Sequence, residues 1–341
     1  MKTNRFVLSV LCVLISALPV LGKKVVPLPE LLKPEDLVVD QNQLFITEFP
    51  QVYIYSLEDF KLITKFGKKG EGPREFSGYV TARPHPDKPG TIVVNSGMKV
   101  SFYTRDGEFV NEMRSKAGMI GRIYKPLGEN YAAYGFFREK ETGYRTVDIY
   151  NPNLEKVKEV TRWIRAMQVP GSLNPLDTDM EGGEFRVFDN KIFVLLRDKG
   201  SIGVFDRNGK KRSSIDHNFE RIPVTSEDIG RFNRYYETDN ISREFYKNNK
   251  DLFKYPSHFP AARSMFVTDN KIYVLTNKRQ GEKSEFIIFD TGGKFLEKRM
   301  VPFENANPRV PYPWTVKSGK LYQLVDNDEE EEWELHIHEL N

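Results

Sequence analysis

The stretch that decides the fold is V-T-D-N-K-I-Y-V-L at Val267–Leu275, followed after a polar break by E-F-I-I-F-D-T-G-G-K-F-L at Glu285–Leu296. The same two phrases occur earlier, as V-F-D-N-K-I-F-V-L at Val187–Leu195 and S-I-G-V-F-D-R-N-G-K-K at Ser201–Lys211. Each phrase alternates apolar and polar residues beside a turn sequence, which is typical of half-buried β-strands. The repetition predicts a sheet unit that recurs along the chain.

Aligned on these phrases, the chain from about residue 36 divides into six units, each of which is predicted to contain four strands. An apolar residue opens the second strand of each unit, at Leu44, Ile92, Tyr131, Ile192, Ile272 and Leu321. An aromatic residue closes the third strand in five units, and a histidine closes it in the sixth, at Tyr55, Tyr103, Tyr150, Phe205, Phe289 and His338. Most spacings lie near the roughly 40–50 residues of a propeller blade. We therefore predict an all-β fold, a six-bladed β-propeller of four-stranded blades.

The turns between strands are marked by short glycine-containing pairs. Asp106-Gly107 is the clearest, because Asp-Gly between alternating runs favours a tight turn in which both central residues take positive φ. Asn208-Gly209 and Gly292-Gly293 occupy the same place in later units.

The sixth unit has only three predicted strands before the chain ends. An extended piece near Val25–Leu28 belongs to no unit, and Pro27 and Pro29 restrict any strand there to a sheet edge. A propeller removes its last exposed edge by joining its first and last blades. We predict that this N-terminal strand completes the C-terminal blade.

One long spacing, between the fourth and fifth units, indicates an insertion at about residues 224–259. Thr225 followed by Ser226, Glu227 and Asp228 is typical of a helix N-cap with acidic residues in the first turn. Apolar residues at helical spacing follow, beginning with Ile229 and Phe232. We predict one helical insertion that covers a face of the disc.

The glycine-rich segment F-G-K-K-G-E-G-P-R-E-F at Phe66–Phe76 follows the fourth strand of the first unit. It resembles the joint of NHL-repeat proteins and, more closely, that of the secreted bacterial six-bladed propellers described as TolB-like. The phrases D-N-K-I-Y-V and F-D-x-x-G-K, and Pro256–Pro260 before the fifth unit, are similar to the same family. The resemblance implies a periplasmic or surface-exposed propeller, and it supplies no catalytic motif.

Residues 1–22 have the features of a signal peptide. Lys2 and Arg5 precede an apolar run from Phe6 to Leu18, and this run is shorter than the about 20 residues needed to span a membrane. We expect cleavage, a mature domain of residues 23–341 without a membrane span, and a secreted or periplasmic location. The single cysteine, Cys12, follows a leucine inside the apolar run, which disfavours lipoprotein anchoring.

The composition excludes several function classes. Among the 341 residues, 13% are aromatic and 29% are charged, which excludes a disordered chain. The formal net charge is +3, and it falls to about +1 without Lys2 and Arg5. No stretch is basic enough to predict nucleic-acid binding.

Residues that lead into the six innermost strands would encircle one mouth of the central channel. In chain order they are Asp36, Tyr79, Arg122, Glu184, His258, Arg263 and Trp314. Residues of the insertion that could lean over the same mouth are Arg231, Arg234, Tyr235, Tyr236 and Arg243. Mixed charge with aromatic residues is typical of a cleft for a polar ligand or carbohydrate. Alternatively, these side chains only cap the ends of strands.

Three further patterns have structural as well as chemical interpretations. The glycine joint lacks the G-K-[ST] ending of a phosphate-binding loop and is better explained as a turn. His336 and His338 share one face of a strand without a fixed third metal ligand. The acidic run Asp326–Glu332 lacks the ordered spacing of a calcium loop and fits a solvated hairpin tip. The sequence predicts no metal site and no cofactor.

These observations favour a ligand-binding or protein-interaction module with its site at the channel mouth. The partner would be a small molecule, a glycan or an envelope protein. The alternative is a lyase or hydrolase that acts on a polysaccharide or peptide through charged channel residues. A third possibility is a scaffold protein of an envelope complex that uses the rim of the disc.

Overall fold

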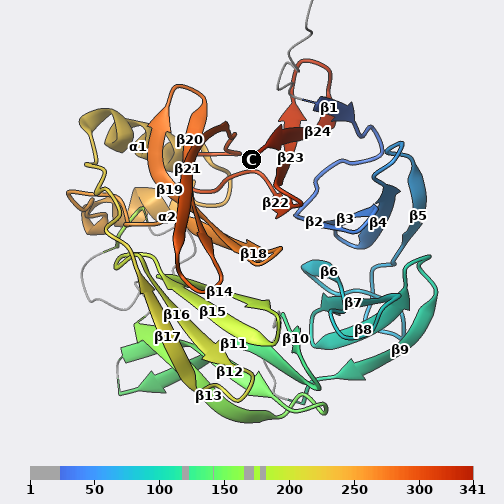
Figure 1. Cartoon of the computed structure of the whole chain (residues 1–341). Helices are drawn as coiled ribbons and strands as arrows, with labels where there is room; N and C mark the ends of the chain where they lie inside the picture. The colour runs from blue at the N-terminus through green and yellow to red at the C-terminus, as the bar shows by residue number, and fades with distance from the viewer. Residues whose placement is uncertain (1–23, 117–122, 141, 165–172, 177–181, 341) are drawn as a thin grey trace, which may run out of the picture.

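The computed structural model describes residues 24–116, 123–140, 142–164, 173–176 and 182–340. Within these residues, six four-stranded antiparallel sheets stand around a common centre. Figure 1 shows the first strand of each sheet nearest the centre and the later strands progressively farther out. The chain is therefore a six-bladed β-propeller, as the repeat predicts.

The first three blades follow one another along the chain. The first blade contains β2 (Asp36–Asp40), β3 (Gln43–Glu48), β4 (Gln51–Ser56) and β5 (Leu62–Phe66). The second contains β6 (Val80–Pro84), β7 (Thr91–Ser96), β8 (Lys99–Thr104) and β9 (Phe109–Arg114). The third contains β10 (Lys125–Leu127), β11 (Asn130–Glu139), β12 (Thr142–Tyr150) and β13 (Lys156–Ile164).

The last three blades complete the ring. The fourth blade contains β14 (Gly183–Phe188), β15 (Lys191–Leu196), β16 (Ser201–Asp206) and β17 (Lys211–Asp216). The fifth contains β18 (Ser264–Thr268), β19 (Lys271–Gln280), β20 (Lys283–Asp290) and β21 (Phe295–Pro302). The sixth contains β22 (Trp314–Lys317), β23 (Lys320–Asn327), β24 (Glu332–Glu339) and β1 (Lys24–Pro27).

The two repeated positions of the sequence are cross-strand partners in every blade. The pairs are Leu44–Tyr55, Ile92–Tyr103, Tyr131–Tyr150, Ile192–Phe205, Ile272–Phe289 and Leu321–His338. All twelve side chains are buried, with no more than 8% of their surface exposed. A slip of one residue would turn a strand's apolar set to the opposite face, so these pairs fix the register of each blade.

The aromatic position is also where the pairing of the third and fourth strands becomes irregular. In each of the first five blades the register shifts immediately before this residue, as at Tyr55 and Tyr103. The expectation that both central residues of Asp106-Gly107 take positive φ is wrong, because only Gly107 does, at 85°. A turn that ends in a left-handed residue produces a bulge in the adjoining pair, and this residue is Phe60, Gly107, Leu154, Gly209 or Gly293 in the five blades.

The N-terminal strand closes the ring, as predicted. β1 pairs antiparallel with β24, from Lys24 opposite Ile337 to Pro27 opposite Glu334. Beyond it, the amide of Leu28 donates to the Trp333 carbonyl at 2.7 Å. The Leu28 side chain is 1% exposed and packs in the core between the first and sixth blades. The two ends of the domain are therefore held in one sheet.

The insertion folds as two helices, α1 (Ser226–Thr238) and α2 (Arg243–Asn249), followed by a 3₁₀ turn at Lys250–Leu252. Thr225 and Asp228 form the reciprocal hydrogen bonds of a capping box at the start of α1. In Figure 1 both helices lie beside the blade of β18–β21 and away from the centre of the ring. No helix in the described residues is long and apolar enough to cross a membrane.

The glycine joint is a packed turn between the first two blades. A Cβ on Gly67 would lie 2.3 Å from the Pro50 carbonyl oxygen, at a φ of 119° that side chains rarely adopt. Lys99, which is 4% exposed, donates to the carbonyl oxygens of Gly72, at 2.6 Å, and of Glu75. These contacts explain the glycines and the neighbouring lysine without a bound phosphate.

Candidate functional site

Five of the predicted mouth residues occur where an innermost strand begins. Asp36 and Trp314 are the first residues of β2 and β22, and Glu184 is the second residue of β14. Tyr79 and Arg263 directly precede β6 and β18. Because the six first strands enter the ring in the same sense, their beginnings lie at one end of its centre. Arg122, the sixth residue of this set, lies outside the described residues.

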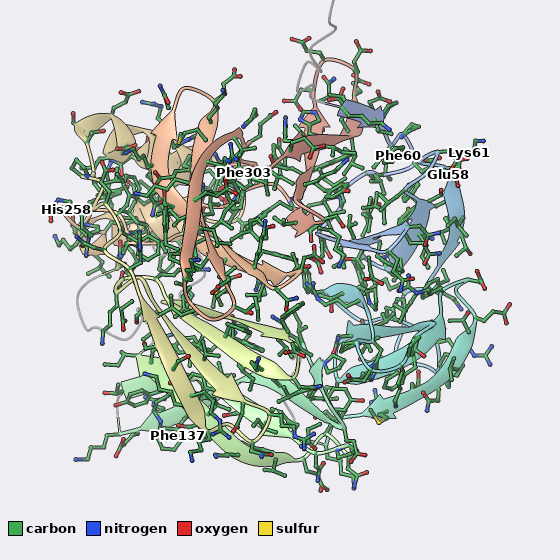
Figure 2. The ribbon with its side chains drawn as sticks, in the orientation of Figure 1. Glu58, Phe60, Lys61, Phe137, His258 and Phe303 are labelled. Carbon is green, nitrogen blue, oxygen red and sulfur yellow. The ribbon has the colours of Figure 1, made fainter. Side chains whose placement is uncertain are left out.

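Two other predicted residues lie away from the centre. His258 pairs with Pro223 in an isolated bridge that joins the two ends of the insertion, and Figure 2 places it at the outer edge of the molecule. Tyr235 packs into the small aromatic cluster of the insertion. The expectation that these two residues converge on the channel mouth is wrong, because the insertion folds away from the centre of the ring.

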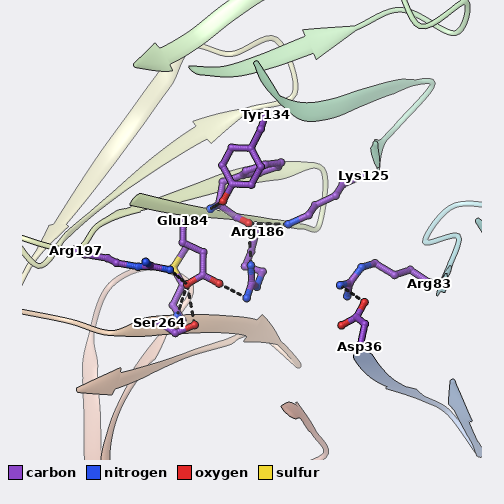
Figure 3. A network of polar contacts seen from close by, with 10 residues as sticks. Asp36, Arg83, Lys125, Tyr134, Glu184, Arg186, Arg197 and Ser264 are labelled. Atoms are coloured by element: carbon purple, nitrogen blue, oxygen red, sulfur yellow. Dashed lines mark hydrogen bonds and ion pairs between the residues drawn. The ribbon is translucent and has the colours of Figure 1, made fainter. Parts of the chain in front are cut away.

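Five charged side chains, here called the central cluster, meet at the centre of the ring (Figure 3). They are Asp36, Arg83, Lys125, Glu184 and Arg186. Arg83 pairs with Asp36 at 2.9 Å, and Arg186 pairs with Glu184. The cluster therefore joins β2, β6, β10 and β14, which belong to four different blades.

Glu184 is the most constrained member of this cluster. It is 6% exposed and accepts hydrogen bonds from the Ser264 hydroxyl at 2.8 Å and the Met265 amide at 3.1 Å. A second guanidinium, that of Arg197, lies 3.8 Å from it. These donors satisfy the buried carboxylate and link the fourth blade to the fifth.

Lys125 has a different environment from the two arginines. Its ammonium donates to the Phe185 carbonyl oxygen at 2.8 Å and lies 4.1 Å from the centroid of the Phe185 ring. Burial, and then the positive charges of Arg186 and Arg83, lower its pKa well below the usual range. In the residues that the structure describes, no carboxylate lies within ion-pair distance of this ammonium.

Tyr79 stands beside the same charges. Burial, followed by the negative charge of Asp36, raises the pKa of its phenol. The hydroxyl therefore stays protonated at neutral pH and is able to donate a hydrogen bond.

Trp314 is a packing residue as well as a mouth residue. Its ring centroid lies 5.9 Å from that of Phe266, 5.7 Å from Phe286 and 5.6 Å from Phe303. It is only half-buried, but three aromatic neighbours hold it in the core between the last two blades. The indole is therefore not an isolated aromatic surface, and its removal would disturb the core as well as any site.

A cavity of about 1280 Å³, here called the roofed cavity, lies between α1, the fourth and fifth blades and the segment 303–309 that leads to the sixth blade. Its polar lining includes Arg197, Asp198, Glu227, Asp228, Arg231, Arg263, Asn277, Arg279, Glu282, Glu304, Asn305 and Arg309. Of the phenylalanines beside the cavity, Phe259 is partly exposed, whereas Phe232 and Phe303 are buried in the cores of the insertion and of the blades. The volume exceeds the roughly 300–1000 Å³ usual for small-molecule pockets.

The positive charges in the roofed cavity are unevenly compensated. Asp228 pairs with Arg231 at 2.7 Å, while its other oxygen accepts the Thr225 amide and hydroxyl of the capping box. Arg279 forms no ion pair within the described ranges of the chain. Burial, and then the neighbouring Arg231, lower the pKa of Arg279. Asp228 is therefore occupied by Arg231 and by the helix cap, and Arg279 has no carboxylate partner among the described residues.

The roofed cavity and the central cluster adjoin each other. Arg197 lines the cavity and approaches Glu184, and its carbonyl accepts the amide of Ala262, another lining residue. Arg263, the next residue, also lines the cavity and leads into β18. Of the residues that the sequence predicted, the cavity thus includes Arg231 and Arg263, and the central cluster includes Asp36 and Glu184.

Sequence reasoning missed Arg83, Lys125, Arg186 and Arg279. Arg186 lies two residues after Glu184, and alternate residues of a strand share a face. A search for charged residues at alternate positions of the innermost strands would have found it together with Arg83. Arg279 lies in the hairpin of the fifth blade and has no sequence signal of its own.

No group of three or more potential ligand residues in the described chain is arranged to hold a metal ion. His336 is 3% exposed and lies 2.7 Å from Glu334 and 3.3 Å from Glu304. The acidic run at 326–332 forms the hairpin between β23 and β24, as expected.

No family model and no curated protein sequence matches the chain. A solved structure from Bacteroides fragilis NCTC 9343, a protein inferred to be exported, is similar over 93% of this chain and 95% of its own, with 11% identity and a TM-score of 0.56. A member of the DUF4221 family from Bacteroides vulgatus ATCC 8482 covers 93% and 97%, with 12% identity and a TM-score of 0.49. The polysaccharide lyase Uly1 covers 90% of both chains, with 10% identity and a TM-score of 0.42. At these identities the likeness shows the fold alone.

Proposed function

We propose that this propeller is an exported binding module that holds a polar ligand with an anionic group in the roofed cavity. Export is supported by the pattern of residues 1–22 and by the likeness of the fold to a propeller inferred to be exported. The glycine joint and the repeated phrases favour kinship with NHL-repeat and TolB-like propellers, which fits the same location.

The observation that carries the proposal is the charge arrangement around Arg279. Arg231 and Arg279 repel each other, and Asp228 is already occupied by its helix cap and by Arg231. The Nε of Arg231 is buried and has no hydrogen-bond partner in the described residues. A carboxylate or sulfate between the two guanidiniums would satisfy these donors with charge-assisted hydrogen bonds.

The remaining lining fits an extended polar molecule such as an acidic oligosaccharide. Amide side chains such as Asn277 and Asn305 offer both donors and acceptors, and the Asn305 Oδ1 is buried without a partner in the described chain. Phe259, which is partly exposed, supplies surface for the apolar face of a sugar ring.

The test is calorimetric titration of the mature protein, residues 23–341, with trigalacturonate and with the neutral trisaccharide galactotriose. We expect trigalacturonate to bind and Arg279→Gln to weaken its binding about ten-fold or more, which corresponds to about 1.4 kcal/mol. Lys283→Gln is the matched control, because Lys283 is an exposed cation in the same hairpin and does not line the cavity.

The control variant should bind like the unmodified protein. The proposal is overturned if trigalacturonate and galactotriose bind equally, if neither binds, or if Arg279→Gln and Lys283→Gln have the same effect.

A further inference from the structure

The central cluster has more positive than negative charge. Arg83, Lys125 and Arg186 extend into the same space from three consecutive blades (Figure 3). Asp36 and Glu184 are the carboxylates within the cluster, and Glu184 is also approached by Arg197. The three cations of the cluster thus share two carboxylates, and an excess charge in a partly desolvated site is costly unless an anion compensates it.

Two of the three cations have unused donors. The Nε of Arg83 is buried and has no hydrogen-bond partner in the described part of the chain. Among the described residues, the Lys125 ammonium donates to one acceptor, the Phe185 carbonyl, although an ammonium has three protons to donate. The Phe185 ring offsets only part of the remaining charge.

The cluster is open enough for a small ion to enter. The side chains of Arg83 and Arg186 keep 30% and 26% of their surface exposed, and Lys125 is only half-buried. The Tyr79 side chain is 46% exposed at the same end of the ring. Its protonated hydroxyl is a further donor for a negatively charged group.

We propose that Arg83, Lys125 and Arg186 form a binding site for one oxyanion at the centre of the propeller, distinct from the roofed cavity. The group is a phosphate, sulfate or carboxylate, either free or carried by a larger molecule. Two guanidiniums and one ammonium from three blades would donate to it, while Asp36 and Glu184 keep the guanidiniums in place. The site differs from a structural ion-pair network because the Lys125 ammonium has no carboxylate of the described residues within ion-pair distance.

The lowered pKa of Lys125 agrees with this assignment. Its two largest electrostatic causes are the charges of Arg186 and Arg83, the same groups that would share the anion. A bound oxyanion would offset this repulsion, so binding and the positive charge of Lys125 support each other.

The test is calorimetric titration of the mature protein with sodium phosphate, sodium sulfate and sodium acetate, each against sodium chloride at equal ionic strength. We expect at least one oxyanion to bind and to raise the melting temperature, since a ligand that binds only the folded state stabilises it. The oxyanion with the largest effect identifies the chemical group.

Lys125→Met is the decisive variant. It keeps the length of the side chain and removes the charge, so it relieves repulsion and should leave the protein folded with an unchanged or higher melting temperature. We expect it to weaken oxyanion binding at least about ten-fold. Lys61→Met is the control, because the Lys61 side chain is 82% exposed and lies at the outer edge of the molecule (Figure 2).

Arg279→Gln separates this proposal from the proposed function. It should leave oxyanion binding unchanged if the ion lies in the central cluster. The inference is overturned if no oxyanion has an effect beyond that of chloride, or if Lys125→Met binds the oxyanion as well as the unmodified protein. Loss of oxyanion binding in Arg279→Gln with retention in Lys125→Met would place the ion in the roofed cavity, which overturns this inference and supports the proposed function.

Discussion

The blades and the helical insertion are stabilised by different kinds of contact. Five blades have a buried pair that ends in Tyr or Phe between the second and third strands, the sixth has Leu321 opposite His338, and the blades share apolar clusters with their neighbours, as around Phe289. The insertion has a small cluster of Phe232, Tyr236 and Tyr246, in which two tyrosines also use their hydroxyls. The ring therefore depends on apolar burial, whereas the insertion also depends on hydrogen bonds.

The residues that stabilise the ring therefore differ from those that line the candidate binding cavity. The charged side chains of α1, with the loops that face it, line the roofed cavity. A substitution in a blade pair should unfold the ring, whereas one in the insertion should alter the cavity and leave the ring intact.

The largest effect is expected at Phe289, which is 2% exposed and lies opposite Ile272. Phe289→Ala would leave a cavity in the core between the fourth and fifth blades and lower the free energy of unfolding by about 3–5 kcal/mol. Urea unfolding followed by circular dichroism measures this loss. Ile241→Ala in the insertion is the control, because Ile241 is 90% exposed, and it should change stability by less than about 0.5 kcal/mol. Equal losses in the two variants would remove the distinction between the two regions.

A smaller effect is expected where the ring closes. Leu28→Ala removes apolar burial between the first and sixth blades and should lower the free energy of unfolding by about 2–3 kcal/mol. Leu32→Ala, four residues further along, is the matched control because Leu32 is 82% exposed. If both variants unfold at the same urea concentration as the unmodified protein, the N-terminal strand does not contribute to closure in solution.

The smallest effect is expected in the insertion. Tyr236→Phe removes the hydroxyl that donates to the Pro175 carbonyl at 2.8 Å, at a cost of about 1 kcal/mol. Hydrogen exchange should become faster in α1 and α2, while the strands of the fifth blade keep the protection of the unmodified protein. Faster exchange throughout the blades would show that the insertion and the ring unfold as one unit.

The sequence predicted the fold well because the repeat is a local pattern with a strong physical cause. Side chains alternate across a strand, so an apolar residue at Ile272 and an aromatic residue at Phe289 mark the buried face of one blade. Pro27 and Pro29 likewise indicated an edge strand, and Thr225 with Asp228 indicated the start of a helix. Each of these inferences needs only neighbouring residues.

The candidate sites were predicted only in part. Asp36, Glu184 and Trp314 were recognised because they begin innermost strands, but the partners of the two carboxylates were not. His258 was predicted at the channel mouth because it precedes the fifth blade. In the structure it pairs with Pro223, where the two ends of the insertion meet. Trp314 was interpreted as a binding surface, whereas three phenylalanine rings surround it.

The sequence by itself determined the six-fold repeat, the closure of the ring by the first strand and the position of the helical insertion. The period of the apolar residues and the residue types of the turns, which carry this information, are set within a few residues. Only the tertiary structure decided that Arg83, Lys125 and Arg186 meet, and that Arg279 and Arg231 line the same cavity. Closure of the ring brings together side chains from distant blades, and their charges then determine which ligand the centre and the cavity are suited to hold.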